Sequence, residues 1–317
     1  MDFITIQNGP IELKVAVSGS GPLIVCVHGF PELWFSWRHQ IAHFAARGFR
    51  VAALDVRGYG GSSKPREIAA YTLRQLASDV VAVIRHFGDG PAVLFGHDWG
   101  APIVWHTALL HPDKIRAVAG LSVPFVPRGS VPFIEAARSA YKGRFFYQIY
   151  FQQEGVAEAE LESDVAGALR RAYFALSGGA PLNKWLEPKP PEARLLDGLV
   201  DPQPFPDWMS ETDLAIYVDA FRAGGFRGPL NRYRAQTIDF AELAELRGRN
   251  IAQPSTFIAG ERDPVRAFIP GIDLYANPAI ACADFRGSTI IPGIGHWVQQ
   301  EAPEQTNVAL EAFVRGL

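Results

Sequence analysis

Residues 93–106, VLFGHDWGAPIVWH, contain the sharpest change of pattern in the chain. An apolar run stops at Gly96, a second apolar run with helical spacing starts at Gly100, and the carboxylate of Asp98 stands between the two glycines. A strand that turns this abruptly into a helix needs small residues on both sides of a strained, exposed central residue, which is typical of a nucleophile elbow. The common alternative is an aspartate that caps the helix N-terminus.

Short apolar runs recur on either side of this turn. They cover residues 23–27, 51–55, 92–96, 118–123, 255–260 and 288–293, and each is followed by turn residues. Runs of this kind suit strands that are buried on both faces, as in a parallel sheet. Helical patterns, such as residues 73–87, lie between the first four runs, and the N-terminal residues read as an edge hairpin that turns at Asn8-Gly9. The alternation predicts an α/β fold with a mostly parallel central sheet flanked by helices.

The alternation stops after the sixth predicted strand. From residue 124 to about residue 236 the sequence contains helical stretches, loops and many aromatic residues, and residues 187–208 form a proline-rich loop. The sheet pattern resumes at residue 255. We therefore predict one core domain made of residues 1–123 and 237–317, with a mostly helical cap, or lid, inserted at residues 124–236.

The composition narrows the classes of partner. The chain has 317 residues and a formal net charge of −3, from 30 basic and 33 acidic residues, without long runs of like charge. Nucleic acid and anionic membrane surfaces are therefore poor candidate partners. The two cysteines imply no disulfide framework, no secretory signal is evident, and no apolar stretch approaches the roughly 20 residues that a membrane span needs. We expect a cytoplasmic protein.

Two further residues follow Asp98 in the chain order that an elbow nucleophile requires, which is nucleophile, acid and then histidine. Asp263 comes directly after one predicted strand, in AGERDP, and His296 follows the last one, in GIGHWVQQ. Either residue alone is ordinary in a turn or loop. Because the carboxyl ends of parallel strands converge at one edge of a sheet, we predict that Asp98, Asp263 and His296 meet there.

The stretch CVHGFP, residues 26–31, supplies a possible anion site. Gly29 allows the backbone to approach closely, and the backbone N–H groups of Phe30 and Trp99 are predicted to form an oxyanion hole. We expect the bond from Phe30 to Pro31 to be cis.

Neighbouring residues are assigned structural roles. The elbow should turn the side chain of His97 away from the site, and His28 is expected to hold a loop by hydrogen bonds. The cysteines and histidines lack metal-ligand spacing, and RGYGGSSKP, residues 57–65, has neither of the phosphate-binding glycine patterns. We therefore expect neither a metal nor an organic cofactor.

An aromatic stripe lies within the predicted cap. Residues 141–151 contain Tyr141, Phe145, Phe146, Tyr147, Tyr150 and Phe151, and such a stripe usually serves packing. Tyr147 and Tyr150 are spaced to share one helix face. The residues alone leave the choice between these two hydroxyls open.

Several motifs together resemble the soluble epoxide hydrolases of the α/β-hydrolase fold. They are HGFPELWFSWRHQ, DVRGYGGSSKP, GHDWGA, ERDPV and GHWVQQEAPE, and within the cap YQIYFQQEGVAEAELE (147–162) and GGFRGPLNRYR (224–234). The resemblance covers nearly the whole chain. One departure is Arg232, where many relatives carry an aromatic residue, so the shape of the pocket wall near Tyr233 is open.

The resemblance implies a role for each site residue. Asp98 is the nucleophile, His296 is the general base, and Asp263 orients and charge-stabilises that histidine. Tyr147, rather than Tyr150, and Tyr233 are the ring-opening acids. The implied enzyme converts a small hydrophobic epoxide and water into a vicinal diol through a covalent aspartyl ester.

Three other functions are alternatives for a chain with these residues. A haloalkane dehalogenase would share Asp98, Asp263 and His296 but needs N–H donors for halide, and relatives with that activity usually have asparagine where Phe30 stands. A serine esterase is disfavoured because the elbow carries Asp98, and a catalytically silent binding protein is disfavoured by the intact set of residues. The sequence leaves open the natural epoxide and the choice between a monomer and a homodimer.

Overall fold

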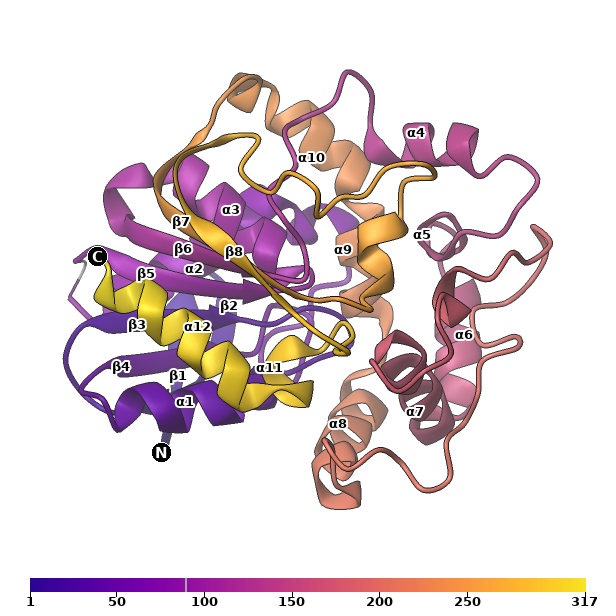
Figure 1. The fold of residues 1–317 in the computed structure, drawn as a ribbon, viewed down its shortest axis with the longest axis horizontal. Coiled ribbons are helices and arrows are strands. Elements are labelled where there is room, and N and C mark those ends of the chain that lie inside the picture. The colour runs from indigo at the N-terminus through magenta and orange to yellow at the C-terminus, as the bar shows by residue number, and fades with distance from the viewer. Residues whose placement is uncertain (89) are drawn as a thin grey trace.

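The computed structural model describes residues 1–88 and 90–317. Its centre is an eight-stranded sheet with the order β1-β2-β4-β3-β5-β6-β7-β8 (Figure 1). The strands are β1 Asp2–Asn8, β2 Ile11–Ser18, β3 Leu23–Val27, β4 Arg50–Leu54, β5 Ala92–His97, β6 Ile115–Leu121, β7 Ile251–Gly260 and β8 Cys282–Ile291. Strand β2 runs antiparallel to both of its neighbours, β1 and β4, and the remaining pairs are parallel. The predicted α/β fold with a mostly parallel sheet is confirmed.

Helices cover both faces of the sheet, which is why its central strands are apolar throughout. In β3, Ile24 and Cys26 pack with one group of helices, and Val25 and Val27 pack with another, because successive strand residues point to opposite faces. The first group is α1 Arg38–Ala45 and α12 Pro303–Arg315, and the second is α2 Leu73–His86 and α3 Gly100–Leu110. The short helix α11 Val298–Glu301 precedes α12.

The predicted strand runs fall on real strands, but β6, β7 and β8 each start at least three residues earlier than predicted. Strand β7 begins at Ile251, since Gln253 and Pro254 interrupt its apolar pattern where the pairing with β8 shifts register. Strand β8 lies at the edge of the sheet and is largely exposed. Its first half carries charged residues, so this half does not form an apolar run in the sequence. The N-terminal hairpin pairs Asn8 with Ile11, which places its turn at Gly9 and Pro10.

Residues 122–250, all of which the structure describes, form helices and loops without a strand. The helices are α4 Phe133–Ala140, α5 Tyr147–Tyr150, α6 Val156–Ser163, α7 Val165–Leu176, α8 Glu211–Gly224, α9 Arg227–Arg234 and α10 Gln236–Glu242. Figure 1 shows α5 to α8 grouped to one side of the sheet. Residues 187–208 form a long loop, as the prolines predict. Short 3-10 turns lie at Trp34–Trp37, Ile68–Tyr71, Pro112–Lys114, Lys184–Leu186, Ala244–Leu246 and Pro264–Ala267.

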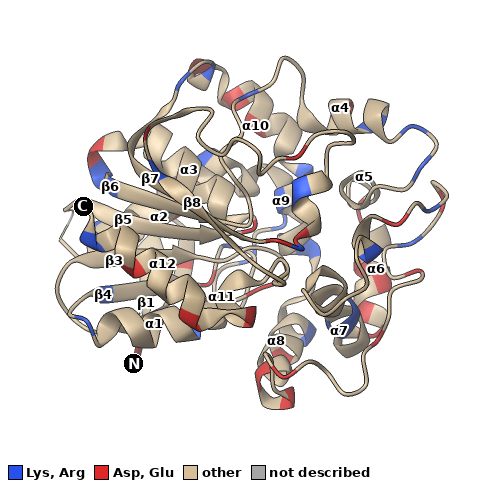
Figure 2. Cartoon of the chain, viewed as in Figure 1, with Lys and Arg blue, Asp and Glu red and all other residues tan. Residues whose placement is uncertain are grey.

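Buried ion pairs fasten the last helices of this segment, residues 122–250. Figure 2 shows basic residues on α9 and acidic residues on α6. Arg234 of α9 donates to both carboxylate oxygens of Glu158 on α6, at 2.7 and 2.9 Å, and both side chains are buried. Arg232 pairs with Asp239 of α10, whose Oδ1 also accepts the backbone N–H of Leu73 at 2.6 Å. These contacts connect α9 to α6 and α10 and, through Asp239, to the start of α2.

We predict that Arg234→Met lowers the free energy of unfolding by about 3 kcal/mol or more, because it leaves the buried Glu158 carboxylate without its partner. Urea unfolding followed by circular dichroism measures the loss. The control is Arg286→Met, which breaks an exposed pair with Asp284 and should cost about 1 kcal/mol or less. Equally small losses in the two variants would show that the Arg234–Glu158 pair does not stabilise the fold.

Candidate active site

Asp98 lies at the tip of the turn between β5 and α3. Its φ is +50°, a left-handed conformation that residues other than glycine rarely adopt. A Cβ added to Gly96 would lie 2.4 Å from the carbonyl oxygen of Gly100, and a Cβ added to Gly100 would lie 1.9 Å from that of Val27. Both glycines are therefore required by close backbone contacts, and the elbow presents the Asp98 side chain above the sheet.

His296 lies between two carboxylates. Its Nδ1 donates to Oδ2 of Asp263 at 2.9 Å, and its Nε2 is 3.4 Å from Oδ2 of Asp98. Asp263 follows β7 and His296 follows β8, while Asp98 follows β5, so the ends of three parallel strands bring these side chains together. Asp263 and His296 are buried, and the Asp98 side chain remains 16% exposed.

These neighbours decide the charge of His296. Burial alone would lower the pKa of the imidazole, but Asp263 and, after it, Asp98 raise that pKa to about 10. At neutral pH the site therefore holds an imidazolium between the two side chains.

The backbone of residues 29 and 30 packs directly against Asp98. The Phe30 N–H donates to Asp98 Oδ1 at 2.7 Å. A Cβ on Gly29 would lie 2.3 Å from that oxygen and 2.6 Å from the backbone nitrogen of Trp99, so only glycine permits this approach. The bond from Phe30 to Pro31 is cis, as predicted.

Two phenols from the insertion line the same pocket as Asp98. Tyr147 belongs to α5 and Tyr233 to α9, and their ring centroids are 5.9 Å apart. The hydroxyl of Tyr147 accepts a hydrogen bond from Nε2 of Gln148 at 2.9 Å. Burial above all, together with the nearby charge of Asp98, raises the pKa of both tyrosines well above the ordinary value. Both phenols therefore retain their protons at neutral pH.

Tyr150 points to a different partner. Its hydroxyl donates to Oε2 of Glu160 at 2.7 Å, and Tyr150 does not belong to the described residues that line the pocket around Asp98. The geometry thus brings Tyr147, and not Tyr150, to the elbow.

The pocket around Asp98 is apolar except for a few converging groups. The polar ones are Asp98, His296, Tyr147 and Tyr233. The apolar ones come from the loop after β3, from α7, from the segment at residues 185–195 and from the segment after β7, and they include Phe30, Leu169, Leu176, Trp185, Leu195 and Phe268. An apolar cavity with a few directed polar groups is typical of a site for a small molecule.

Comparison with known proteins agrees with this geometry. Residues 22–303 match the family described as alpha/beta hydrolase fold. Epoxide hydrolase A of Mycobacterium tuberculosis is 41% identical in an alignment that covers 98% of this chain and 97% of that protein. This chain belongs to the α/β-hydrolase fold family.

Within the family, its relatives are epoxide hydrolases. Bifunctional epoxide hydrolase 2 of Rattus norvegicus is 37% identical over 99% of this chain and 55% of that protein. The crystal structure of epoxide hydrolase A from Mycobacterium thermoresistibile, at 39% identity, superposes with a TM-score of 0.93 and covers 100% of this chain and 98% of that one. The resemblance found in the sequence motifs is thereby confirmed.

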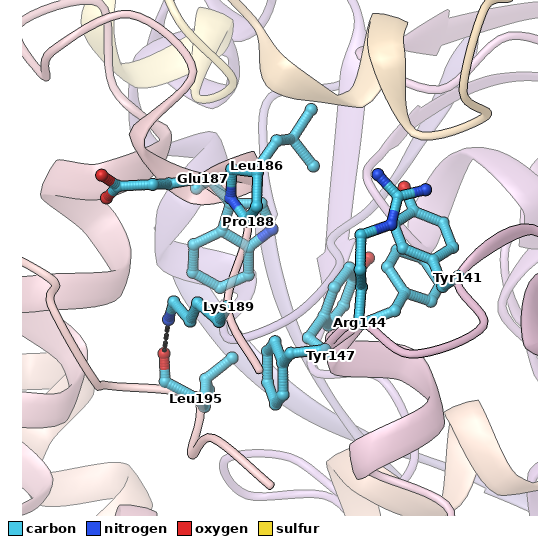
Figure 3. Close-up of a pocket in the computed structure, with 11 residues that line it drawn as sticks. Tyr141, Arg144, Tyr147, Leu186, Glu187, Pro188, Lys189 and Leu195 are labelled. Atoms are coloured by element: carbon cyan, nitrogen blue, oxygen red, sulfur yellow. Dashed lines mark hydrogen bonds between the residues drawn. The ribbon is translucent and has the colours of Figure 1, made fainter. Parts of the chain in front are cut away.

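A second pocket lies on the outer side of Tyr147 in this hydrolase (Figure 3). It shares Tyr147, Trp185 and Leu195 with the pocket around Asp98, so these side chains form the partition between the two. Its lining is more polar and includes Arg144 and Lys189, and Figure 3 shows Nζ of Lys189 donating to the carbonyl oxygen of Leu195, at 2.9 Å.

A buried network behind Asp98, Asp263 and His296 has no clear signal in the sequence. His97 turns away from the pocket, as expected, with Nδ1 2.6 Å from Oε2 of Glu32 and Nε2 2.8 Å from the carbonyl oxygen of His296. Both neighbours are hydrogen-bond partners of the ring, which therefore has a fixed orientation behind His296. Burial disfavours the charged form of Glu32, but His97 outweighs it and lowers the pKa of Glu32 to about 2. Glu32 also accepts the Gly29 N–H at 3.0 Å, which links the network to the anion site.

His28 and Arg232 also have defined positions. His28 holds the loop after β3, since Nδ1 bonds the Gly29 carbonyl oxygen at 2.9 Å and Nε2 accepts the Val56 N–H at 3.0 Å. The Arg232 guanidinium lies 4.8 Å from the centre of the Trp99 ring and is buried. Arg232 thus covers the indole from outside, and the described lining of the pocket does not include it.

Residues 1–88 and 90–317 lack two other features. They contain no cluster of three or more histidine, cysteine, aspartate or glutamate side chains that could hold a metal ion. None of their helices is both long and apolar enough to cross a membrane.

We predict that Gly100→Ala lowers the free energy of unfolding by about 3 kcal/mol or more, because its Cβ would overlap the Val27 carbonyl group. Thermal unfolding measured by calorimetry tests this. Gly90→Ala is the control, since a Cβ there meets no atom within 4 Å, and it should change stability by about 0.5 kcal/mol or less. Similar melting temperatures for both variants would mean that the elbow can widen to accept a side chain.

Proposed function

We propose that this chain is an epoxide hydrolase that converts a small hydrophobic epoxide and water into a vicinal diol through an ester on Asp98. The observation that carries the proposal is the pair of buried, protonated phenols, Tyr147 and Tyr233, in the same apolar pocket as Asp98. An epoxide oxygen leaves carbon as a strongly basic alkoxide and needs a proton, whereas a halide leaves as a stable anion. The named relatives support the same activity.

We infer that residues 124–236 act as a cap on a core made of residues 1–123 and 237–317. Tyr147 and Tyr233 come from the cap segment, and Asp98 and His296 come from the core. The pocket is therefore complete only when both parts are in place. A cytoplasmic location stays a prediction from the sequence, which leaves the choice between a monomer and a homodimer open.

In the first step, Asp98 opens the epoxide ring. Its Oδ1 is held by the Phe30 N–H, so Oδ2 attacks the epoxide carbon while the carbon–oxygen bond of the ring breaks. The departing oxygen takes a proton from Tyr147 or Tyr233. The product is a hydroxy ester on Asp98 and one phenolate, and the phenolate can recover the proton that His296 carries in the resting site.

In the second step, His296 activates water. Ester formation removes the charge of Asp98, one of the groups that raise the pKa of His296, so the imidazole gives up its proton more readily. Neutral His296 then takes a proton from water, and the hydroxide attacks the ester carbonyl carbon. The charge that develops on Oδ1 meets the Phe30 and Trp99 N–H groups. The acyl–oxygen bond breaks, and the diol leaves with the former Oδ2 after that oxygen takes the proton of the newly formed Asp98 carboxylic acid. The oxygen of water stays in the Asp98 carboxylate, and His296 keeps the proton that it took from water.

We predict that a single turnover in ¹⁸O-labelled water labels Asp98 and leaves the diol unlabelled, because water attacks the acyl carbon. His296→Gln should accumulate an adduct with the mass of enzyme plus epoxide, on the peptide that contains Asp98. Asp98→Ala should form no adduct and no diol while its melting temperature stays close to that of the parent. Label found in the diol after one turnover would contradict the covalent mechanism. Intact-protein and peptide mass spectrometry give all of these readouts.

We predict that Tyr147→Phe and Tyr233→Phe each slow ester formation and that the double variant nearly stops it, since general acid catalysis contributes roughly 10²- to 10⁴-fold. Single-turnover quenching with styrene oxide measures this step. The matched control is Tyr150→Phe, whose hydroxyl is bound to Glu160 and should not affect the rate.

Two results would overturn this assignment. A folded double variant that is alkylated at the parent rate would place the acid elsewhere, with Tyr150 as the first candidate. Faster release of halide from a haloalkane than opening of any epoxide tested would favour the dehalogenase alternative, in which Asp98, Asp263 and His296 keep their roles and the tyrosines serve packing.

A further inference from the structure

Tyr275 is a buried tyrosine behind the triad, in the loop between β7 and β8. Its hydroxyl oxygen is 2.7 Å from Oδ2 of Asp263 and 2.6 Å from the main-chain carbonyl oxygen of Ser122. The same Oδ2 accepts the Nδ1–H of His296 at 2.9 Å. A phenol has one proton to donate, and a carboxylate and a carbonyl oxygen both accept. The hydroxyl therefore has two acceptors that compete for one proton.

We propose that Tyr275 is a positioning residue that donates its hydroxyl to Asp263 and thereby limits how strongly Asp263 holds the proton of His296. The inference rests on the proposed function, because it concerns the step in which His296 must be neutral.

The donors around Asp263 explain the effect. Oδ1 accepts the Val265 N–H at 2.9 Å, and Oδ2 accepts from both His296 and Tyr275. Each donor to an ionised carboxylate stabilises its charge and leaves less of that charge to attract the imidazolium. Removal of the Tyr275 hydroxyl should therefore raise the pKa of His296 further above its ordinary value. Hydrolysis of the ester, which needs neutral His296, would then reach half of its maximal rate at a higher pH.

The carbonyl oxygen of Ser122 is an alternative acceptor for the hydroxyl of Tyr275, so the hydrogen bond from Tyr275 to Asp263 can weaken or strengthen. Ser122 follows β6 with φ +63°, an unusual conformation for a serine, and its Oγ donates to the carbonyl oxygen of His296 at 2.6 Å. When His296 is protonated, its charge compensates Asp263, and the Ser122 carbonyl oxygen competes better for the hydroxyl of Tyr275. When His296 is neutral, the carboxylate is the stronger acceptor. The shift of one proton between two acceptors thus follows the charge of the base.

Tyr275→Phe leaves the other charged and titratable groups near these residues chemically unchanged. Asp98 and His97 lie beside His296, and Glu32 lies behind His97. Tyr147 and Glu301 interact with Asp263. Arg266 and Asp273 lie beside Tyr275. A change in the pH dependence of Tyr275→Phe is therefore assigned to the hydroxyl.

The test compares Tyr275→Phe with Tyr71→Phe. Tyr71 is equally buried, and its hydroxyl donates to the carbonyl oxygen of Pro65 at 2.7 Å, so the control loses a similar bond to neutral backbone. Enzyme is alkylated by styrene oxide in single turnover, and ester formation and ester hydrolysis are followed separately by quenching and mass spectrometry from pH 5 to pH 10. In Tyr275→Phe we expect the rising limb of hydrolysis to move up by about one pH unit, which is about tenfold slower hydrolysis below the midpoint. Ester formation should stay within about twofold, and Tyr71→Phe should match the parent in both steps.

A second pair of variants keeps the inference falsifiable if packing also changes. In an Asp263→Asn background there is no carboxylate charge to moderate, so adding Tyr275→Phe should leave the hydrolysis rate unchanged. An equal slowing in both backgrounds, or an unshifted limb in Tyr275→Phe, would overturn the inference and leave Tyr275 as a packing residue bonded to Ser122. A parent enzyme that forms no diol from any epoxide would instead refute the proposed function, so the two failures are distinguishable.

Discussion

The contact between two backbone segments at the tip of β5 is the constraint on which the site depends. Because Gly100 has no side chain, α3 can start directly against the carbonyl group of Val27, and β3 and β5 stay paired up to the turn. The same approach brings the Phe30 N–H onto the Asp98 carboxylate. The strained backbone of Asp98 costs roughly 1–3 kcal/mol. A hydrogen bond to a charged group contributes roughly 1.5–3 kcal/mol, so the anion site offsets the strain of the residue that it serves.

The fold also sets the protonation states of the residues in the pocket. Tyr147 and Tyr233 are buried and keep theirs, and His296 holds one between two carboxylates. Ring opening consumes one proton, which a phenol already holds, and ester hydrolysis needs a free base, which His296 becomes only after it gives up the proton that it carries at rest. Behind them, the ring of His97 lies between Glu32 and the backbone carbonyl oxygen of His296 and helps to hold the His296 backbone in place.

Local signals account for what the sequence predicted. Apolar runs locate the buried strands, glycine spacing locates Asp98, and chain order points to Asp263 and His296. The sequence does not predict the contacts of Tyr275 and Glu32, because the topology of the fold sets their partners. Glu32 meets His97 only because β3 and β5 lie side by side, and Tyr275 occupies a loop without periodicity. The spacing of Tyr147 and Tyr150 does not decide which of the two hydroxyls lies near Asp98. The structure separates them through Glu160, a partner from α6 that no pattern within the stripe indicates.

The two sides of the pocket differ in how firmly they are held. Tyr233 stands between Arg232, paired with Asp239, and Arg234, paired with Glu158, so its helix is anchored on both flanks by buried charges. Tyr147 begins the short helix α5 and faces Trp185 in a loop region with little regular structure. A buried ion pair resists displacement because separating it exposes uncompensated charge, whereas a loop held by ring contacts can shift at lower cost. Tyr233 is therefore fixed relative to Asp98, and we expect differences in the size of epoxide accepted to arise on the side of Trp185 and Leu195.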